Sequence, residues 1–248
     1  RMRKRDGEVR LLWPSADHTP TFVDHMVQDM LRVEDGIAYV ATIDQGLLRL
    51  DLASGSVSHY DRSLSEGSCR TSNELMTGAA RLLRMDEGLC IGSYTQGVAI
   101  WSARNNAVEA VQLPPHPPPE ENDEVFDLHR DARNGRVFAT SHRRGVFVFD
   151  STAGRPLGRM HHADPAQRYY FHSLLDKDHL FLGSTPHAWI ATLGDGALER
   201  PRYLDPRTPC GGMIWWARGD GAHGLWCFTG SKGIHHVDTL SGRCIALQ

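Results

Sequence analysis

The sequence predicts an all-β protein built from five copies of one unit. Each copy reads as an apolar segment, a turn that ends in Gly, a second apolar segment, an Asp-containing turn and a third segment. The copies begin at Ile37, Leu89, Val137, Leu180 and Leu225. A repeat period of about 40–50 residues, made of short strands and tight turns, is typical of β-propeller blades.

The first two strands of each unit are expected to form a hairpin. An apolar segment precedes each copy, at His25–Val33, Ala79–Met85, Glu124–Asp131, Tyr170–Asp176 and Met213–Asp220. Three of the connections end in Asp-Gly, Asp-x-Gly or Asn-Gly, namely Glu34–Gly36, Asp86–Gly88 and Arg133–Gly135. Gly accepts the positive φ of a tight turn, so these are strong hairpin signals. The following strand is almost continuously apolar, which indicates burial on both faces.

Two further turns complete the unit. Gly46, Gly97, Gly145 and Gly233 close the second turn and are expected to have positive φ, whereas the fourth unit has Thr185–Ala188 there. The third turn is Asp51–Gly55, Asp150–Gly154 or Asp238–Gly242. An Asp at this position can accept hydrogen bonds from the backbone two residues on, so we interpret these carboxylates as turn caps rather than as catalytic acids. Each unit is therefore a four-stranded antiparallel meander that must stack on its neighbours.

The predicted architecture is a β-propeller segment with five full blades and one partial blade. Residues 1–24 would supply the outer strands of the partial blade, and the successive blades would span 25–78, 79–123, 124–169, 170–212 and 213–248. The two ends do not complete one shared blade. The chain is therefore expected to be an arc of a larger propeller, or an atypical ring of five to six blades.

The first unit resembles the two-component-regulator propeller repeat. Its residues Asp35–Gly55 read DGIAYVATIDQGLLRLDLASG, and Gly224–Trp226, Gly233 and Asp238–Gly242 of the fifth unit follow the same pattern. The WD dipeptide of WD repeats is missing from it. The resemblance implies the periplasmic sensor region of a bacterial hybrid histidine kinase or diguanylate cyclase, with signalling domains further along the same chain.

The composition of the chain argues against some classes of function. The net charge of −3 and the lack of a basic patch with stacked aromatic residues argue against a nucleic-acid partner. No run of 18 apolar residues and no signal peptide are found, so we expect the chain to be part of a longer precursor. Of the five cysteines, Cys90 and Cys227 are expected to be core residues, and Cys69 and Cys210 could pair in an oxidising compartment. No metal-ligand spacing is present, and no cofactor is expected.

The candidate ligand site is the face of the second turns. The residues expected there are Asp44, Gln45, Tyr94, Gln96, His142, Arg143, Arg144, His187 and Lys232. Planar amides, Arg and aromatic side chains suit sugars or carboxylates. Arg143 and Arg144 are expected to be solvated turn tips and the strongest electrostatic anchor of this face.

The expected function is ligand sensing without catalysis in a periplasmic, membrane-anchored receptor. A small sugar or carboxylate is the expected ligand, and a homodimer is compatible with the sequence. Two alternatives stay open. A propeller enzyme acting on polysaccharide, a lyase or a glycosidase, would need convergent His, Tyr, Arg or carboxylate groups, and an interaction scaffold would bind a peptide on the same face.

Overall fold

The computed structural model describes most of the predicted strands. It covers residues 26–43, 46–59, 78–102, 107–111, 113, 124–160, 169–176, 179–185, 188–192, 202–203, 214–220, 222–229, 233–241 and 243–247. All regular secondary structure in these ranges is β-strand, which confirms the all-β prediction. The strands form five four-stranded antiparallel sheets, each with its strands in chain order. The predicted partial blade at residues 1–24 lies outside the described residues.

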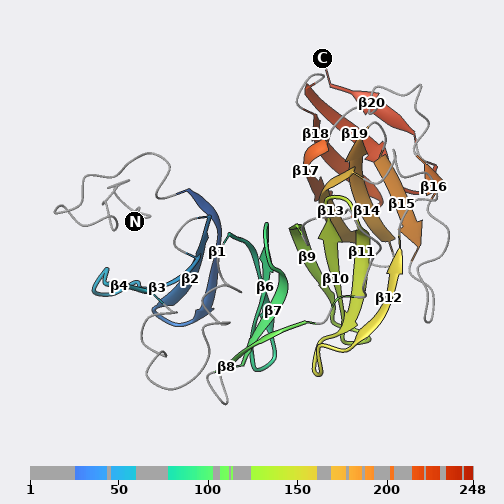
Figure 1. The fold of residues 1–248 in the computed structure, drawn as a ribbon. Helices are drawn as coiled ribbons and strands as arrows, with labels where there is room; N and C mark the ends of the chain where they lie inside the picture. Colours follow the sequence, from blue (N-terminus) through green and yellow to red (C-terminus); the bar gives the residue numbers. More distant parts are fainter. Residues whose placement is uncertain are drawn as a thin grey trace, which may run out of the picture. The chain divides into compact units, whose positions relative to one another are not determined.

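The chain divides into two compact units, which we describe separately (Figure 1). Unit 1, Arg1–Ala110, contains two sheets. The first comprises β1 (Val27–Glu34), β2 (Ile37–Thr42), β3 (Gly46–Asp51) and β4 (Val57–His59). The second comprises β5 (Ala79–Met85), β6 (Gly88–Ser93), β7 (Gly97–Ser102) and β8 (Ala107–Ala110).

Unit 2, Val111–Gln248, contains three sheets of the same kind. The first comprises β9 (Val125–Asp131), β10 (Arg136–Ser141), β11 (Gly145–Asp150) and β12 (Pro156–Met160). The second comprises β13 (Tyr169–Asp176), β14 (His179–Thr185), β15 (Ala188–Thr192) and β16 (Arg202–Tyr203). The third comprises β17 (Ile214–Gly219), β18 (Gly224–Thr229), β19 (Gly233–Asp238) and β20 (Cys244–Ala246). Within this unit β13 lies against both β9 and β17.

The turn glycines confirm most of the backbone predictions. Gly46, Gly97, Gly145 and Gly233 all have positive φ, between 67° and 91°. Each of them opens a third strand and pairs with the last residue of the second strand. In the first turns, Gly36 and Gly135 also have positive φ.

Gly88 differs from the other two glycines of the first turns. It lies at the start of β6 without a positive φ, and a Cβ there would collide with the backbone carbonyl of Trp101 on β7. The reason for glycine at this position is therefore the close approach of two backbones rather than turn geometry.

The Asp residues of the third turns act as caps, as predicted. The Asp51 carboxylate accepts hydrogen bonds from the N–H groups of Ala53 at 2.9 Å and Ser54 at 2.8 Å. Asp150 makes the same pair of bonds with Thr152 and Ala153, and Asp238 with Leu240 and Ser241. These backbone donors lower the pKa of all three carboxyl groups.

Apolar faces hold successive sheets together. In unit 1, Ile37, Tyr39, Ala41 and Leu47 of the first sheet form one buried cluster with residues of the second sheet, including Leu89, Ile91 and Trp101. In unit 2, Phe181 of β14 clusters with Ala217, Leu225, Cys227, Val237 and Cys244 of the last sheet. The sheets in these two clusters thus depend on a neighbouring sheet for burial, as expected for stacked repeats.

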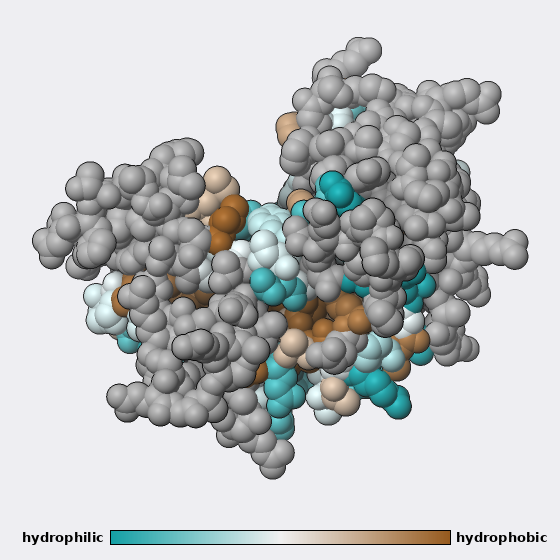
Figure 2. Space-filling model, viewed as in Figure 1, coloured by the Kyte–Doolittle hydropathy of each residue, from teal (hydrophilic) through white to brown (hydrophobic). Residues whose placement is uncertain are grey.

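Some apolar side chains stay at the surface. Met26 and Val27 are about half exposed, and Figure 2 shows hydrophobic residues, in brown, over the beginning of β1. Single exposed apolar residues of this kind are normal for a protein surface. Among the residues that the structure describes, no helix has the length and hydropathy to cross a bilayer.

Candidate functional site

The turn between β6 and β7 carries two of the predicted site residues, Tyr94 and Gln96. The Ser93 hydroxyl accepts hydrogen bonds from the N–H groups of Thr95 and Gln96, both at 3.1 Å. The Tyr94 hydroxyl donates to the side-chain oxygen of Gln28 on β1 at 2.9 Å. Tyr94 is therefore tied to the neighbouring sheet of unit 1, whereas Gln96 is exposed.

The turn between β10 and β11 carries His142, Arg143 and Arg144. His142 Nδ1 lies 2.9 Å from Glu124 Oε2, and its backbone N–H donates to the Glu124 carbonyl at 3.1 Å. The His142 ring also contacts Phe126, with ring centroids 5.2 Å apart. Because these contacts come from both the backbone and the side chain, the imidazole is held in a defined orientation at the start of β9.

The two arginines of this turn lie in different environments. Arg143 is exposed, as expected for a turn tip. Arg144 is only 3 % exposed, and its guanidinium lies over the Phe147 ring, 4.9 Å from the centroid. The expectation that both are solvated tips is therefore wrong for Arg144. A cation over an aromatic face, with its methylene stem buried, is a packing interaction.

A polar pair on β9 was not predicted. Asp127 is 5 % exposed, and its carboxylate lies 3.8 Å from His129 Nε2. The two residues are neighbours on one face of the strand because side chains alternate along a β-strand. Asp127 also pairs in register with Thr140, which is fully buried. The Asp-x-His spacing in a first strand was the only available signal, and it does not distinguish a buried pair from an exposed one.

The same end of the β9–β12 sheet thus gathers several ionisable side chains. Glu124 and Asp127 lie at the start of β9, and His142, Arg143 and Arg144 connect β10 to β11. Both carboxylates have a histidine close by, and Arg143 is exposed at this end. This arrangement can offer the exposed Arg143 to an anionic or hydroxyl-rich ligand. The His142 imidazole is fixed beneath the surface, because its Nδ1 is paired with Glu124 and its Nε2 is buried. Asp44, Gln45, His187 and Lys232 lie outside the described residues.

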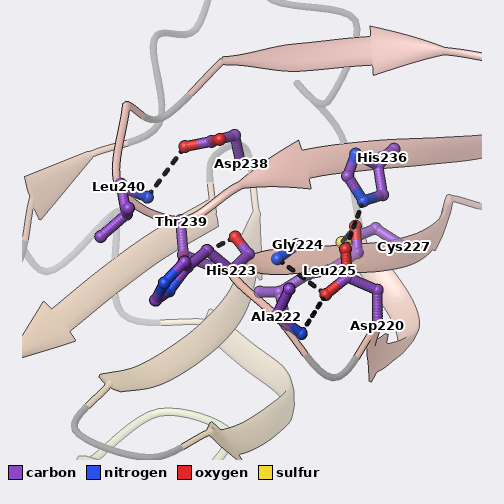
Figure 3. Close-up of polar contacts among 10 residues, drawn as sticks. All are labelled: Asp220, Ala222, His223, Gly224, Leu225, Cys227, His236, Asp238, Thr239 and Leu240. Carbon is purple, nitrogen blue, oxygen red and sulfur yellow. Dashed lines mark hydrogen bonds and ion pairs between the residues drawn. The ribbon is translucent and has the colours of Figure 1, made fainter.

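A second polar cluster lies in the last sheet (Figure 3). The Asp220 carboxylate accepts hydrogen bonds from the N–H groups of Ala222 at 2.8 Å and Gly224 at 3.0 Å, and lies 3.0 Å from His236 Nε2. These hydrogen bonds lower the pKa of Asp220 to about 2. The largest contribution comes from the backbone N–H of Ala222, and smaller ones come from the His236 side chain and the backbone N–H of Gly224. The Trp226 ring stands 4.6 Å from the ring of His236. No motif in the sequence marks these residues as a cluster.

The cysteines belong to two classes. Cys90 and Cys227 are buried free thiols, as predicted, and burial raises the pKa of both, that of Cys227 to about 12. A thiol with so high a pKa is unreactive near neutral pH. Cys244 forms a disulfide. Cys69 and Cys210, which were predicted to be able to pair, lie outside the described residues.

Comparisons with known proteins support the fold. No family model and no curated protein sequence matches the chain. Among solved structures, the extracellular domain of BT4673 from B. thetaiotaomicron, described as a one-component or a hybrid two-component system, matches with a TM-score of 0.63 at 19% identity. That match covers 82% of this chain and 26% of the other.

Two further structures match at lower identity. The extracellular domain of BT3049, a hybrid two-component system of the same organism, matches with a TM-score of 0.55 at 14% identity, over 91% of this chain and 35% of that one. A computationally designed protein, Ika8, matches with a TM-score of 0.62 at 13% identity, over 88% of this chain and 60% of that one. The chain therefore spans less than two thirds of the length of each of these structures, and it shares with them a fold of repeated four-stranded antiparallel sheets.

Proposed function

We propose that the chain is a ligand-sensing segment of the extracytoplasmic part of a bacterial signalling receptor, folded as stacked blades of a β-propeller. The observation that carries this proposal is the shared fold with the extracellular domains of BT4673 and BT3049. The repeat phrase of Asp35–Gly55 points to the same class independently of the fold. In this function the segment binds and does not catalyse, and signalling domains elsewhere in the same polypeptide give the output.

The disulfide of Cys244 supports the extracytoplasmic location. Disulfides persist in oxidising compartments and are rare where glutathione keeps thiols reduced. A receptor segment on the outer side of the cytoplasmic membrane would meet this condition, and a cytosolic protein would not.

The ligand class follows from the end of the β9–β12 sheet that holds His142. Arg143 is exposed, and the pairing of His142 with Glu124 fixes the turn residue that precedes it. An Arg fork binds a carboxylate or a pair of sugar hydroxyl groups with defined geometry. We therefore expect a small carboxylate or a sugar acid rather than a cation.

A binding event at this site can be coupled to sheet packing. Glu124 immediately precedes β9, and β9 lies against β13 of the next sheet. A ligand that binds better to one arrangement of Glu124 and His142 would favour one packing of these two sheets. By linkage, such a preference shifts the population of any signalling state that depends on that packing.

The test is a thermal-shift screen of sugars, sugar acids and dicarboxylates, followed by titration of any hit against two variants. Arg143→Ala should weaken the hit about tenfold or more, the value of one charge-assisted hydrogen bond of roughly 1.5 kcal/mol or above. Arg155→Ala is the matched control, because Arg155 is exposed at the other end of the same sheet. A hit that is indifferent to Arg143→Ala places the site elsewhere, and turnover of a glycan library would support a propeller enzyme instead.

A further inference from the structure

One face of the last sheet is apolar and open. Along β18 the side chains alternate sharply: Leu225 and Cys227 are each 1 % exposed, whereas Trp226 and Phe228 are 37 % and 45 % exposed. Strand pairing places three more exposed apolar residues beside them on the same face: Trp216, Ile234 and Ile245. Five large apolar side chains on one sheet face exceed the scattered exposure of an ordinary surface.

The equivalent face can be compared between this sheet and the other sheets. The second turn gives a common register, because Gly46, Gly97, Gly145 and Gly233 each pair with the last residue of the preceding strand. Counted from this pair, Trp226 corresponds to Tyr39, Cys90 and Phe138, which are between 0 % and 5 % exposed. Ile234 corresponds to Leu47, Val98 and Val146, all at most 1 % exposed. The same positions are therefore buried in three other sheets, whereas Trp226 and Ile234 of the last sheet are exposed.

The two apolar clusters show which neighbour covers these positions. In unit 1, Tyr39 and Leu47 pack against Leu89, Ile91 and Trp101 of the sheet that follows in the chain. In the register of the last sheet, Leu225, Cys227 and Val237 are the equivalents of Leu89, Ile91 and Trp101. These three residues pack against Phe181, which belongs to the preceding sheet. Both clusters obey one rule: the face with the Tyr39, Phe181 and Trp226 positions meets the following sheet.

From this rule we propose that the open face of the β17–β20 sheet binds a further four-stranded sheet of the same repeat, carried by a longer polypeptide. The partner should present apolar residues at the positions of Leu89, Ile91 and Trp101. The matched extracellular domains are long enough for such an extension, because the chain spans only 26–35% of them. The proposal rests on the stacking within each unit and does not depend on ligand sensing.

A second copy of this chain fits the face less well. An isologous dimer would bring two Trp226 faces together, whereas both observed clusters join two different faces. The opposite face of the β1–β4 sheet offers little open apolar surface either: Ala38, Leu48 and Leu50 on it are already buried, although Met30 on the same face is 60 % exposed.

One polar group of the open face, His236, already has a hydrogen-bond partner. His236 lies between Trp226 and Ile245 in the strand register, and its ring is paired with Asp220 at 3.0 Å. The Asp220 carboxylate also accepts the N–H groups of Ala222 and Gly224. Groups that already have hydrogen-bond partners cost less to bury than unpaired ones. Arg218, which pairs in register with Trp226, is an exposed charge on this face, so the covering sheet should place a hydrogen-bond acceptor near it or leave it at the edge of the contact.

Site-resolved tryptophan oxidation tests the proposal. The 248-residue chain and the natural full-length polypeptide are treated with N-bromosuccinimide, and each tryptophan is followed by peptide mass spectrometry. In the 248-residue chain, Trp226 should react much faster than Trp101, which is 8 % exposed. In the full-length polypeptide, Trp226 should react as slowly as Trp101.

Three outcomes would overturn the proposal. Trp226 could stay reactive in the full-length polypeptide, or that polypeptide could contain no further repeat. Protection of Trp226 in the 248-residue chain that rises with protein concentration would instead identify a second copy as the occupant.

Charge substitutions separate this face from general stability. Phe228→Glu should leave the urea midpoint of the 248-residue chain unchanged and restore Trp226 reactivity in the full-length polypeptide. Leu240→Glu is the matched control, because Leu240 is 54 % exposed in the turn after β19; it should change neither measurement. If Phe228→Glu lowers the urea midpoint, Ile234→Glu repeats the test at a side chain that is 49 % exposed, and a drop for both variants would show that the face is packed within the 248-residue chain.

Discussion

At the scale of single residues, adjacent side chains of one turn have separate roles. Arg143 is exposed, while Arg144 is buried over Phe147. Two neighbouring arginines in a sequence look alike, but a turn directs successive side chains to different sides. The exposed one lies at the surface, and the buried one contributes to packing.

Substitution of the two arginines should therefore have opposite consequences. Arg144→Ala should lower the free energy of unfolding by about 1–2 kcal/mol, because it removes a partly desolvated cation–π contact and the buried stem. Arg143→Ala should change it by less than about 0.5 kcal/mol, as is usual for exposed residues. Urea unfolding measures both. Equal effects of the two substitutions would contradict the difference in burial.

The capping carboxylate of Asp220 should make stability depend on pH. Its pKa in the folded state is about 2, below the ordinary value, so it stabilises the fold fully above the unfolded pKa of about 4. That contribution should be lost as the pH falls from about 4 to about 2. Asp220→Asn keeps an acceptor for the backbone N–H groups but cannot titrate, so it should flatten the slope of unfolding free energy in this window. An unchanged slope would mean that other carboxylates with lowered pKa, namely Asp51, Asp131, Asp150 and Asp238, account for all of it.

At the scale of elements, glycine serves two purposes. Gly46 and Gly145 open third strands with φ of 67° and 91°, which side chains with a Cβ rarely adopt. Gly88 has ordinary backbone geometry but lies against the Trp101 carbonyl. A hairpin can thus require glycine for its turn or for the closeness of its strands.

Valine in place of Gly46 or Gly145 should cost about 1–2 kcal/mol of stability through backbone strain. Thermal unfolding of each variant gives the measurement. Gly158→Ala is the control, because a Cβ at Gly158 meets nothing within 4 Å. Melting temperatures that stay the same in both valine variants would show that these turns adjust without strain.

Gly88→Ala should also destabilise, by about 1–3 kcal/mol, although no φ is strained. The cause would be steric overlap with backbone atoms, which cannot rotate away as a side chain can. Urea unfolding followed by circular dichroism measures the effect. The same measurement on Gly158→Ala shows how much of it comes from replacing any glycine by alanine. Equal stability of the two variants would mean that β6 and β7 can move apart at no cost.

At the scale of the whole molecule, repeated sheets are stabilised only by their neighbours. Each described apolar cluster combines residues of two sheets, so the stability of any sheet depends on what covers both of its faces. In an oxidising compartment, a disulfide bond would add a covalent link to these contacts.

The disulfide of Cys244 predicts the number of free thiols in the chain. The unreduced, denatured chain should show three free thiols by Ellman titration, since five cysteines are present and one disulfide consumes two. Cys244→Ser should show four, because its former partner becomes free. Five thiols in the unreduced chain, purified from the periplasm, would contradict both the disulfide and the proposed location.

The local features of this protein could be read from its sequence. Strand positions, the positive φ of Gly46 and Gly145, and the capping role of Asp51 depend on residues close together in the chain, so periodicity and turn chemistry were sufficient. The family-like phrase and the repeat period likewise indicated the fold that the solved structures share.

The tertiary structure alone decided what each side chain touches. The burial of Arg144, the Asp127–His129 pair and the Tyr94–Gln28 bond depend on how strands and sheets meet, and residues with the same spacing can be exposed or enclosed. The open face at Trp226 is the plainest case. Its apolar residues resemble those of the other units in sequence, and their exposure depends on whether another sheet packs on them.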